Sequence, residues 1–175
     1  MNRKALHKIS YGMYIVSSRN GDKFNGQIAN SVFQVTAEPP RLAVCINKKN
    51  LTHEYIECSG VLSVSVMSVN TPMKQIGLFG FRSGRDVDKF GSVEYFTAKT
   101  GSPIVNENSV AYVECKIQNK HDVGTHTIFI CEIVYADIIC DEEPMTYAYY
   151  HHIKGGKSPE TAPTFLGYKK EERGG

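Results

Sequence analysis

The residues best suited to chemistry gather in segment 47–53, NKKNLTH, directly after an apolar run. They offer amide, ammonium, hydroxyl and imidazole groups from Asn47, Lys48, Thr52 and His53. Asn50 or Thr52 can cap a helix that runs to about Ser59, and free backbone N–H groups at a helix start beside lysines bind phosphate well. A solvated rim of exposed lysines accounts for the same residues. A phosphate site and a solvated rim therefore stand as alternatives.

A second set of donors lies in segment 79–85, FGFRSGR. Its glycines permit a close approach of the backbone to a ligand. Arg82 and Ser83 offer donors beside Phe81, and a guanidinium fork matches phosphate geometry better than an ammonium group does. An exposed basic loop paired with nearby aspartates is the alternative.

His126 and Cys45 are the two side chains that could act on a substrate. His126 stands at the mouth of an apolar strand whose residues Ile128 and Ile130 we expect to point inward. A lone histidine on an apolar face is usually structural, and a free cysteine is usually a small buried hydrophobe. A metal held by this pair would need further ligands, which the sequence does not supply at matching spacing. We expect no tightly bound metal.

Alternating apolar residues predict the strands that must position these groups. The expected strands cover residues 13–18, 23–28, 32–36, 41–47, 62–66, 110–118 and 125–139. Asn20-Gly21 predicts a hairpin between the first two, and residues 119–124 form the expected turn between the last two. Within 41–47, one face is apolar and the other is small and polar, so a ligand can lie against the second. The apolar face carries Leu42, Val44 and Ile46, and the other carries Ala43, Cys45 and Asn47.

Short helices are expected at residues 3–10, 53–59 and 73–79. Gly60 should end the second helix, and Pro72 should occupy the first position of the third. Strands joined by turns, with a few short helices outside them, indicate an antiparallel barrel.

Composition favours one globular domain, at residues 1–165, followed by a disordered tail at 166–175. The chain has 175 residues, of which 41% are hydrophobic and 22% charged, and a net charge of +2, far from that of a nucleic-acid binder. No apolar run is long enough for a membrane span, and no secretory core follows the N-terminus, so we expect a cytoplasmic protein. Five cysteines without a CxxC pair suggest buried, reduced thiols.

The segment from Gly26 to His53, GQIANSVFQVTAEPPRLAVCINKKNLTH, resembles the flavin reductase-like, FMN-binding split-barrel family. Within it the chain is most similar to the branch of ferric reductases, flavoredoxins and high-molecular-weight rubredoxins. The resemblance continues in PMKQIGLFGFRSGRDVDKF, HDVGTHTIFICEI and TYAYYHHIKGGKSPETAPTF, and spans about Leu6 to Phe165. One departure is Gln27-Ile28-Ala29-Asn30, where the wider family commonly has a threonine-alanine-serine pattern.

This resemblance implies a mainly β fold, an antiparallel split β-barrel with Greek-key connections and short peripheral helices. It also implies bound FMN, with the phosphate held by the residues of segment 47–53 and by the 81–83 arm. The flavin ring would lie against Gln27, Ile28, Ala29, Asn30 and Ser31, or these residues form an ordinary barrel strand. Cys45 and Ile46 complete the expected contacts, and His126 would line the nicotinamide side with Cys45 nearby.

The function implied is electron transfer from NAD(P)H through FMN to free flavin, a ferric chelate or a rubredoxin-like redox protein. An FMN-binding electron carrier without efficient NAD(P)H oxidation is the alternative, and a flavin-storage or haem-handling barrel is a third. The family also implies a homodimer. The tyrosine-rich segment 147–154 would be a contact element, or else a core helix within one subunit.

Overall fold

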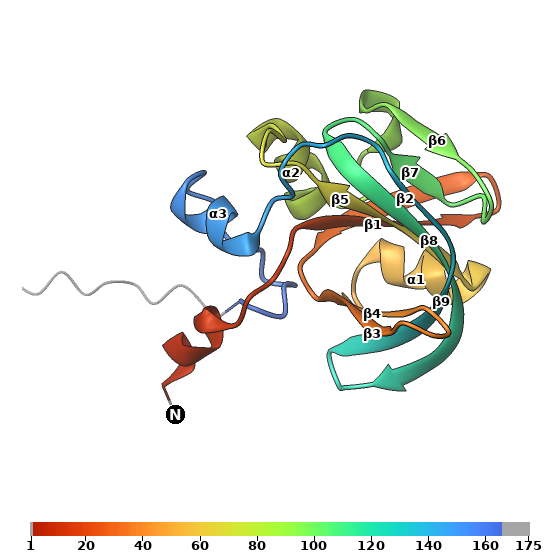
Figure 1. The fold of residues 1–175 in the computed structure, drawn as a ribbon, viewed down its shortest axis with the longest axis horizontal. Coiled ribbons are helices and arrows are strands. Elements are labelled where there is room, and N and C mark those ends of the chain that lie inside the picture. The colour runs from red at the N-terminus through yellow and green to blue at the C-terminus, as the bar shows by residue number, and fades with distance from the viewer. Residues whose placement is uncertain (1, 166–175) are drawn as a thin grey trace, which may run out of the picture.

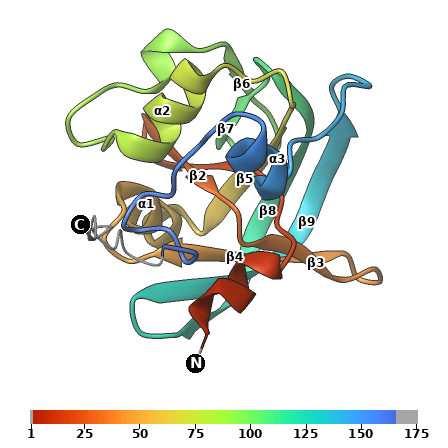
Figure 2. The same ribbon diagram turned by 90° about the vertical axis from the view of Figure 1, so that its left-hand side faces the viewer.

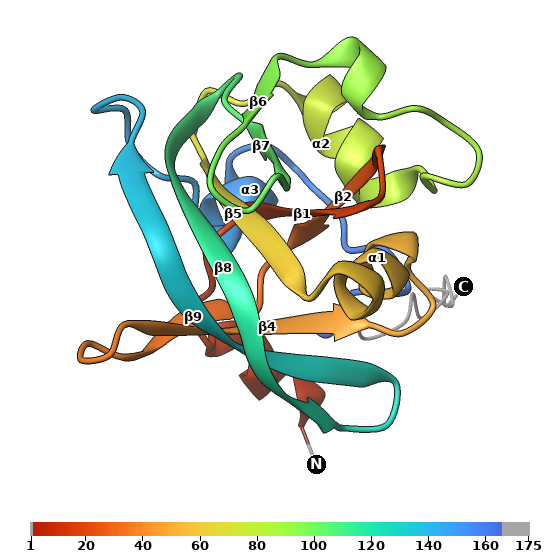
Figure 3. The same ribbon diagram turned by 90° about the vertical axis from the view of Figure 1, so that its right-hand side faces the viewer.

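The computed structural model describes residues 2–165, and its main element is a seven-stranded antiparallel sheet (Figure 1). The strand order is β2-β1-β5-β8-β9-β4-β3. The strands are β1 (Tyr14–Asn20), β2 (Lys23–Ala29), β3 (Val32–Thr36), β4 (Arg41–Asn47), β5 (Val61–Met67), β8 (Ser109–Asp122) and β9 (His126–Ile138). The sheet curls into a barrel (Figure 3). Strands β2 and β3, which follow each other in the chain, form the two edges of the sheet. The expected antiparallel split barrel is confirmed.

Smaller elements surround this barrel. A separate two-stranded sheet pairs β6 (Tyr95–Thr97) with β7 (Pro103–Val105). The helices are α1 (Leu51–Ser59), α2 (Met73–Phe81) and α3 (Tyr147–His152), with 3-10 turns at Arg3–Lys8 and Phe90–Ser92. Among the described residues, no helix has the length and apolar character needed to cross a membrane. The tail expected at residues 166–175 lies outside the described part of the chain.

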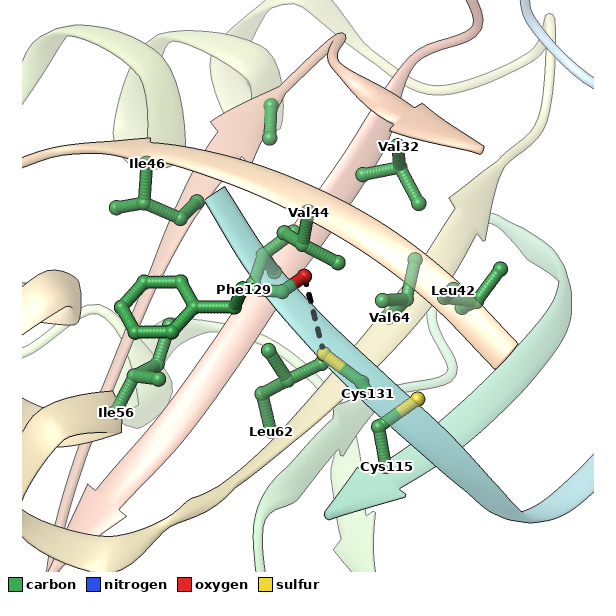
Figure 4. Close-up of a cluster of buried hydrophobic side chains, with 12 residues drawn as sticks. Val32, Leu42, Val44, Ile46, Ile56, Leu62, Val64, Cys115, Phe129 and Cys131 are labelled. Atoms are coloured by element: carbon green, nitrogen blue, oxygen red, sulfur yellow. Dashed lines mark hydrogen bonds between the residues drawn. The ribbon is translucent and has the colours of Figure 1, made fainter. Parts of the chain in front are cut away.

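The barrel interior holds the first hydrophobic core. Val44 and Ile46 from β4, Leu62 from β5 and Phe129 from β9 are each at most 1% exposed and point toward one another (Figure 4). Since β4 places its even-numbered residues inward, Cys45 and Asn47 face the other side, as the alternation predicts.

Helix α1 packs against this core through Ile56. Gly60 ends the helix as expected, with a φ of 69° in the left-handed region and its N–H bonded to the carbonyl oxygen of Ile56. A second core lies between α2, α3 and the outer face of β1. It contains Met13, Ile15, Met67, Ile76, Phe79, Phe90, Val105, Met145 and Tyr150.

The inward face of β9 was predicted wrongly. Thr127, Phe129 and Cys131 are buried, whereas Ile128 and Ile130 are only partly buried. Residues 128–131 are all apolar, so alternation offers no contrast from which to assign a face. His126 therefore shares its face with Ile128, on the side of the sheet away from the barrel core.

Three predicted boundaries were also wrong. β8 continues through Asp122, so the turn placed at 119–124 shortens to residues 123–125, where Gly124 has a φ of 89°. Pairing with β9 over Asn119–Asp122 outweighs the low strand propensity of these polar residues. α1 starts at Leu51 and not at residue 53, and Pro72 precedes the first residue of α2.

Candidate functional site

A cavity of about 550 Å³ lies beside the barrel, between β2, β4, the start of α1 and the end of α2. The chain after α3 closes its remaining side with residues 157–163, which we call the strap. Figure 2 shows this segment running from α3 past β2 toward α1. Segments far apart in sequence thus meet around one space of the size usual for a small-molecule site.

The β4–β9 wall brings Cys45, Asn47 and His126 together. Asn47 lies directly opposite His126 in the strand register, and Cys45 lies opposite Ile128. All three predicted residues line the cavity. Partial burial raises the pKa of the Cys45 thiol, so this cysteine is less ionised than a free one. The wall therefore presents a neutral thiol, an amide and an imidazole to whatever the cavity holds.

The end of β2 supplies a second wall from Gln27, Ile28, Ala29 and Asn30. Asn30 is 4% exposed and donates through Nδ2 to Thr164 Oγ1 at 3.1 Å. The Oε1 atom of Gln27 is buried and has no hydrogen-bond partner among the described residues. A buried acceptor without a donor costs free energy, so Gln27 is suited to receive a donor from a ligand.

The start of α1 forms one end of the cavity, with Asn47, Lys49, Asn50, Leu51 and Thr52 in its lining. The predicted side-chain cap from Asn50 is absent. Asn47 Oδ1 accepts instead from the Lys49 N–H at 3.0 Å. Within the described chain, backbone acceptors take the N–H groups of Asn50 and His53 but not those of Leu51 and Thr52. These two donors, at the positive end of the helix dipole, fit an anion.

The end of α2 and the loop after it complete this end, the helix through Phe81 and the loop through Arg82, Ser83 and Gly84. A Cβ atom on Gly84 would lie 1.9 Å from Asn25 Oδ1, so a side chain there would require the buried Asn25 amide to move. Asn25 in turn donates through Nδ2 to the buried hydroxyl of Thr52 at 2.8 Å. The two segments predicted to bind phosphate, one at the start of α1 and one after α2, are therefore in contact through Asn25.

Lys89 is a cavity residue that sequence reasoning missed. Its side chain is only 4% exposed, and its Nζ donates to the carbonyl oxygens of Gly26 at 2.8 Å and Phe79 at 3.4 Å. Burial lowers the pKa of this ammonium from 10.5 to about 8. Lys89 thus places a cation, or a readily neutralised amine, inside the cavity wall between β2 and the C-terminal end of α2.

The strap was the other omission. The Thr161 carbonyl oxygen accepts from Asn47 Nδ2 at 3.2 Å and lies 3.2 Å from His126 Nε2. The hydroxyl of Tyr147, on α3, bonds Ser158 and also Thr164, the latter at 2.9 Å. The strap is held in place by side chains predicted to contact a ligand, so strap and ligand share the same donors.

Four residues of the predicted site do not line the cavity: Ser31, Ile46, Lys48 and His53. Lys48 forms an ion pair with Asp122 at 2.5 Å, and this pair lowers the pKa of the aspartate. Ile46 is fully buried in the barrel core. Ser31 donates to Asn30 Oδ1 at 3.2 Å and so contacts a residue that lines the cavity.

His53 points toward the barrel interior. Its Nε2 lies 2.8 Å from Thr127 Oγ1, and its ring lies 5.4 Å from that of Phe129. Burial is the main cause that lowers its pKa, with Lys120 and Lys48 acting in the same direction and Glu57 and Glu54 against it. A mostly neutral imidazole held between α1 and β9 fits a structural role.

Comparison with known proteins agrees with this geometry. The sequence profile described as "Flavin reductase like domain" matches residues 6–155. The chain belongs to the flavin reductase-like family. A high-molecular-weight rubredoxin from Moorella thermoacetica is 47% identical over 98% of this chain and 76% of that protein. The ferric-chelate reductase (NAD(P)H) of Archaeoglobus fulgidus is 49% identical over 95% of this chain and 98% of that protein.

The fold is also similar to that of a solved structure. The FMN-binding protein of Thermus thermophilus superposes with a TM-score of 0.69 at 27% identity, covering 75% of this chain and 72% of that one. The expected similarity to ferric reductases and high-molecular-weight rubredoxins is confirmed.

Proposed function

We propose that this protein is a flavin reductase that binds FMN in the cavity and passes electrons from NAD(P)H to an acceptor. Membership of the flavin reductase-like family and the ferric-chelate reductase relative support this activity. The main structural support for this activity is the cavity, which joins the anion-binding end at α1 to a wall that contains Cys45, Asn47 and His126.

The residues present fit FMN. The cavity volume of about 550 Å³ suits a mononucleotide, and Gly84 leaves room where any side chain would collide with Asn25. The N–H groups of Leu51 and Thr52, with Ser83 and Arg82 across the gap, suit the phosphate. The unpartnered Oε1 of Gln27 can accept from a ring N–H group. When bound, FMN supplies the chemistry that accepts a hydride and releases electrons.

The protein's own residues have positioning roles. The β2 wall and the β4–β9 wall form the two sides of a slot for the flavin ring, and Asn47 and His126 lie together where the strap contacts the second wall. His126 orients the nicotinamide once the Thr161 carbonyl releases its Nε2. In such a site most of the rate enhancement comes from geometry.

A flavin titration tests this proposal. We expect FMN to bind one per chain with quenching of its fluorescence, and riboflavin, which lacks the phosphate, to bind at least tenfold more weakly because charge-assisted hydrogen bonds are lost. Equal affinity for FMN and riboflavin would refute the anion-binding end at α1.

An FMN-binding electron carrier is the second candidate, and one observation favours it. The strap carbonyl of Thr161 already engages His126 Nε2, so a nicotinamide must displace the strap to reach this residue. The acceptor would be a ferric chelate, free flavin or a rubredoxin-like protein, and the similarity to a high-molecular-weight rubredoxin supports the last.

We also propose a cytoplasmic homodimer. Within segment 147–154, the contact element considered from sequence, Tyr150 is 2% exposed and belongs to the second core of its own chain. The edge strand β3 is a better candidate for the dimer interface because Phe33 is 61% exposed and Val35 46% exposed beside unpaired backbone groups.

The cytoplasmic location is supported by the five free cysteines, which fit a reducing compartment. Cys58 and Cys140 are exposed and not buried as expected.

A further inference from the structure

A second cavity, of about 830 Å³, lies on the other side of the strap. The segment Lys8–Tyr11, the helix α3 and residues near the strap form its walls. Tyr147, Lys157 and Ser158 line both cavities, so the two spaces adjoin at these residues. An elongated ligand that reaches His126 in the first cavity can extend into the second.

The charged groups around the second cavity are all basic. Lys8, Lys157, His151 and His152 line it, and within residues 2–165 no aspartate or glutamate does. Among residues 2–165, neither Lys8 nor Lys157 forms an ion pair. The whole chain is nearly balanced, with 20 basic and 18 acidic residues, so this local excess of positive charge favours an anionic ligand.

Aromatic rings supply the rest of the wall. Tyr11 and Tyr147 meet edge to face with ring centroids 6.1 Å apart, and Tyr147 meets His151 in the same way at 4.4 Å. Phe165 lines the same space. Aromatic faces beside lysines are the chemistry that recognises a nucleobase carrying phosphate, because a base stacks on the ring while the ammonium groups bind the anion.

We propose that the second cavity binds the 2′-phosphoadenosine end of NADPH, an inference that rests on the proposed function. Sites for NADH typically bind the ribose 2′-hydroxyl through a carboxylate, whereas sites for NADPH place a cation at the 2′-phosphate. With two lysines in the lining, and no carboxylate there from the part of the chain that the structure describes, the cavity is suited to the phosphate. The nicotinamide then lies toward His126, across the strap.

Adenosine 2′,5′-bisphosphate tests the site without the nicotinamide. Calorimetric titration of the FMN-saturated protein should show binding of this ligand, with 5′-AMP at least tenfold weaker because it lacks the 2′-phosphate. Saturation with FMN keeps the probe out of the first cavity. Equal affinity for the two nucleotides, or no binding of either, would overturn the proposal.

Paired variants locate the binding. The double variant Lys8→Ala, Lys157→Ala should lose at least tenfold in affinity for adenosine 2′,5′-bisphosphate and raise the ratio of KM for NADPH to KM for NADH by a similar factor. The matched control Lys23→Ala, Lys116→Ala removes the same charge from exposed positions outside both cavities and should leave the affinity unchanged. An equal loss in both variants would show only a general charge effect and refute the assignment.

The two hypotheses can fail separately. Binding of the bisphosphate without any NAD(P)H oxidation would retain the nucleotide site and reject the reductase. Oxidation of NADPH and NADH with equal KM, and no binding of the bisphosphate, would retain the reductase and reject the nucleotide site.

Discussion

Asn47 and His126 face each other across β4 and β9, and both contact the Thr161 carbonyl of the strap. Their position follows from strand register, which places residues about 80 positions apart in sequence on one wall. Lys48, one residue from Asn47, points to the opposite side and pairs with Asp122. At the residue scale, the difference between a site residue and a structural one is therefore the face of a strand or turn that it occupies.

This difference predicts different outcomes for Ser83, which lines the cavity, and Lys48, which does not. Ser83→Ala removes a hydroxyl from the cavity lining and should weaken FMN binding by about tenfold, the value of one hydrogen bond to a charged group. Lys48→Ala removes an exposed ion pair outside the cavity and should leave FMN affinity within about twofold. Fluorescence titration measures both. A large loss for Lys48→Ala with none for Ser83→Ala would restore the original assignment of the lysine.

Lys89 predicts a pH dependence of stability. Its pKa in the folded protein is about 8, below the ordinary 10.5, so the folded chain loses this proton before the unfolded chain does. Between these two pH values the unfolded state binds more protons, and stability must rise as pH increases. The full contribution is on the order of 3 kcal/mol. Urea unfolding of the flavin-free protein from pH 7.5 to 10.5, with buffers chosen in about half-unit steps, measures it.

Lys89→Met is the control for this rise. The variant keeps an unbranched side chain of similar length but has no titrating group. As pH rises, the unfolding free energy of the wild type should therefore increase relative to that of the variant. Parallel pH profiles for the two proteins would contradict the assigned burial of the ammonium group.

At the scale of elements, a strong alternation of apolar residues with their neighbours predicted a strand that the structure contains. The β4 strand was assigned correctly to its residues and faces because Leu42, Val44 and Ile46 contrast with their neighbours. The strap has no such periodicity, and its place over the cavity depends on hydrogen bonds to Asn47 and His126 that form only in the folded chain. Lys89 was missed for the same reason, since its partners are backbone carbonyls of distant segments.

Alanine substitutions at two glycines test the helix geometry, because they should change the unfolding free energy in opposite directions. Gly60→Ala forces a side chain into a left-handed conformation at the end of α1 and should lower the unfolding free energy by about 1 kcal/mol. Gly77→Ala lies inside α2 and should raise it by about 0.5 kcal/mol or more. A Cβ at either position meets no atom within 4 Å, so packing does not confuse the comparison. Chemical denaturation gives both values, and a shift of the same sign in both variants would contradict the assigned geometry.

At the scale of the whole molecule, the split in the barrel leaves β2 and β3 as edges, and β3 exposes Phe33 and Val35. We predict a dimer in light scattering at micromolar concentration, and Phe33→Asp should convert it to a monomer by placing a charge in an apolar contact. Val123→Asp, in the exposed turn between β8 and β9, is the matched control and should remain dimeric. A wild-type protein that is monomeric at this concentration would exclude the proposed interface.

Anaerobic mixing of the FMN-loaded protein with NADPH tests whether the protein is a reductase. We expect the visible flavin absorbance to bleach at a rate that saturates with NADPH concentration, because the nucleotide first binds beside His126 and the strap. A protein that binds FMN and is bleached by dithionite, but not by NADPH or NADH, would contradict the reductase and identify an electron carrier in its place.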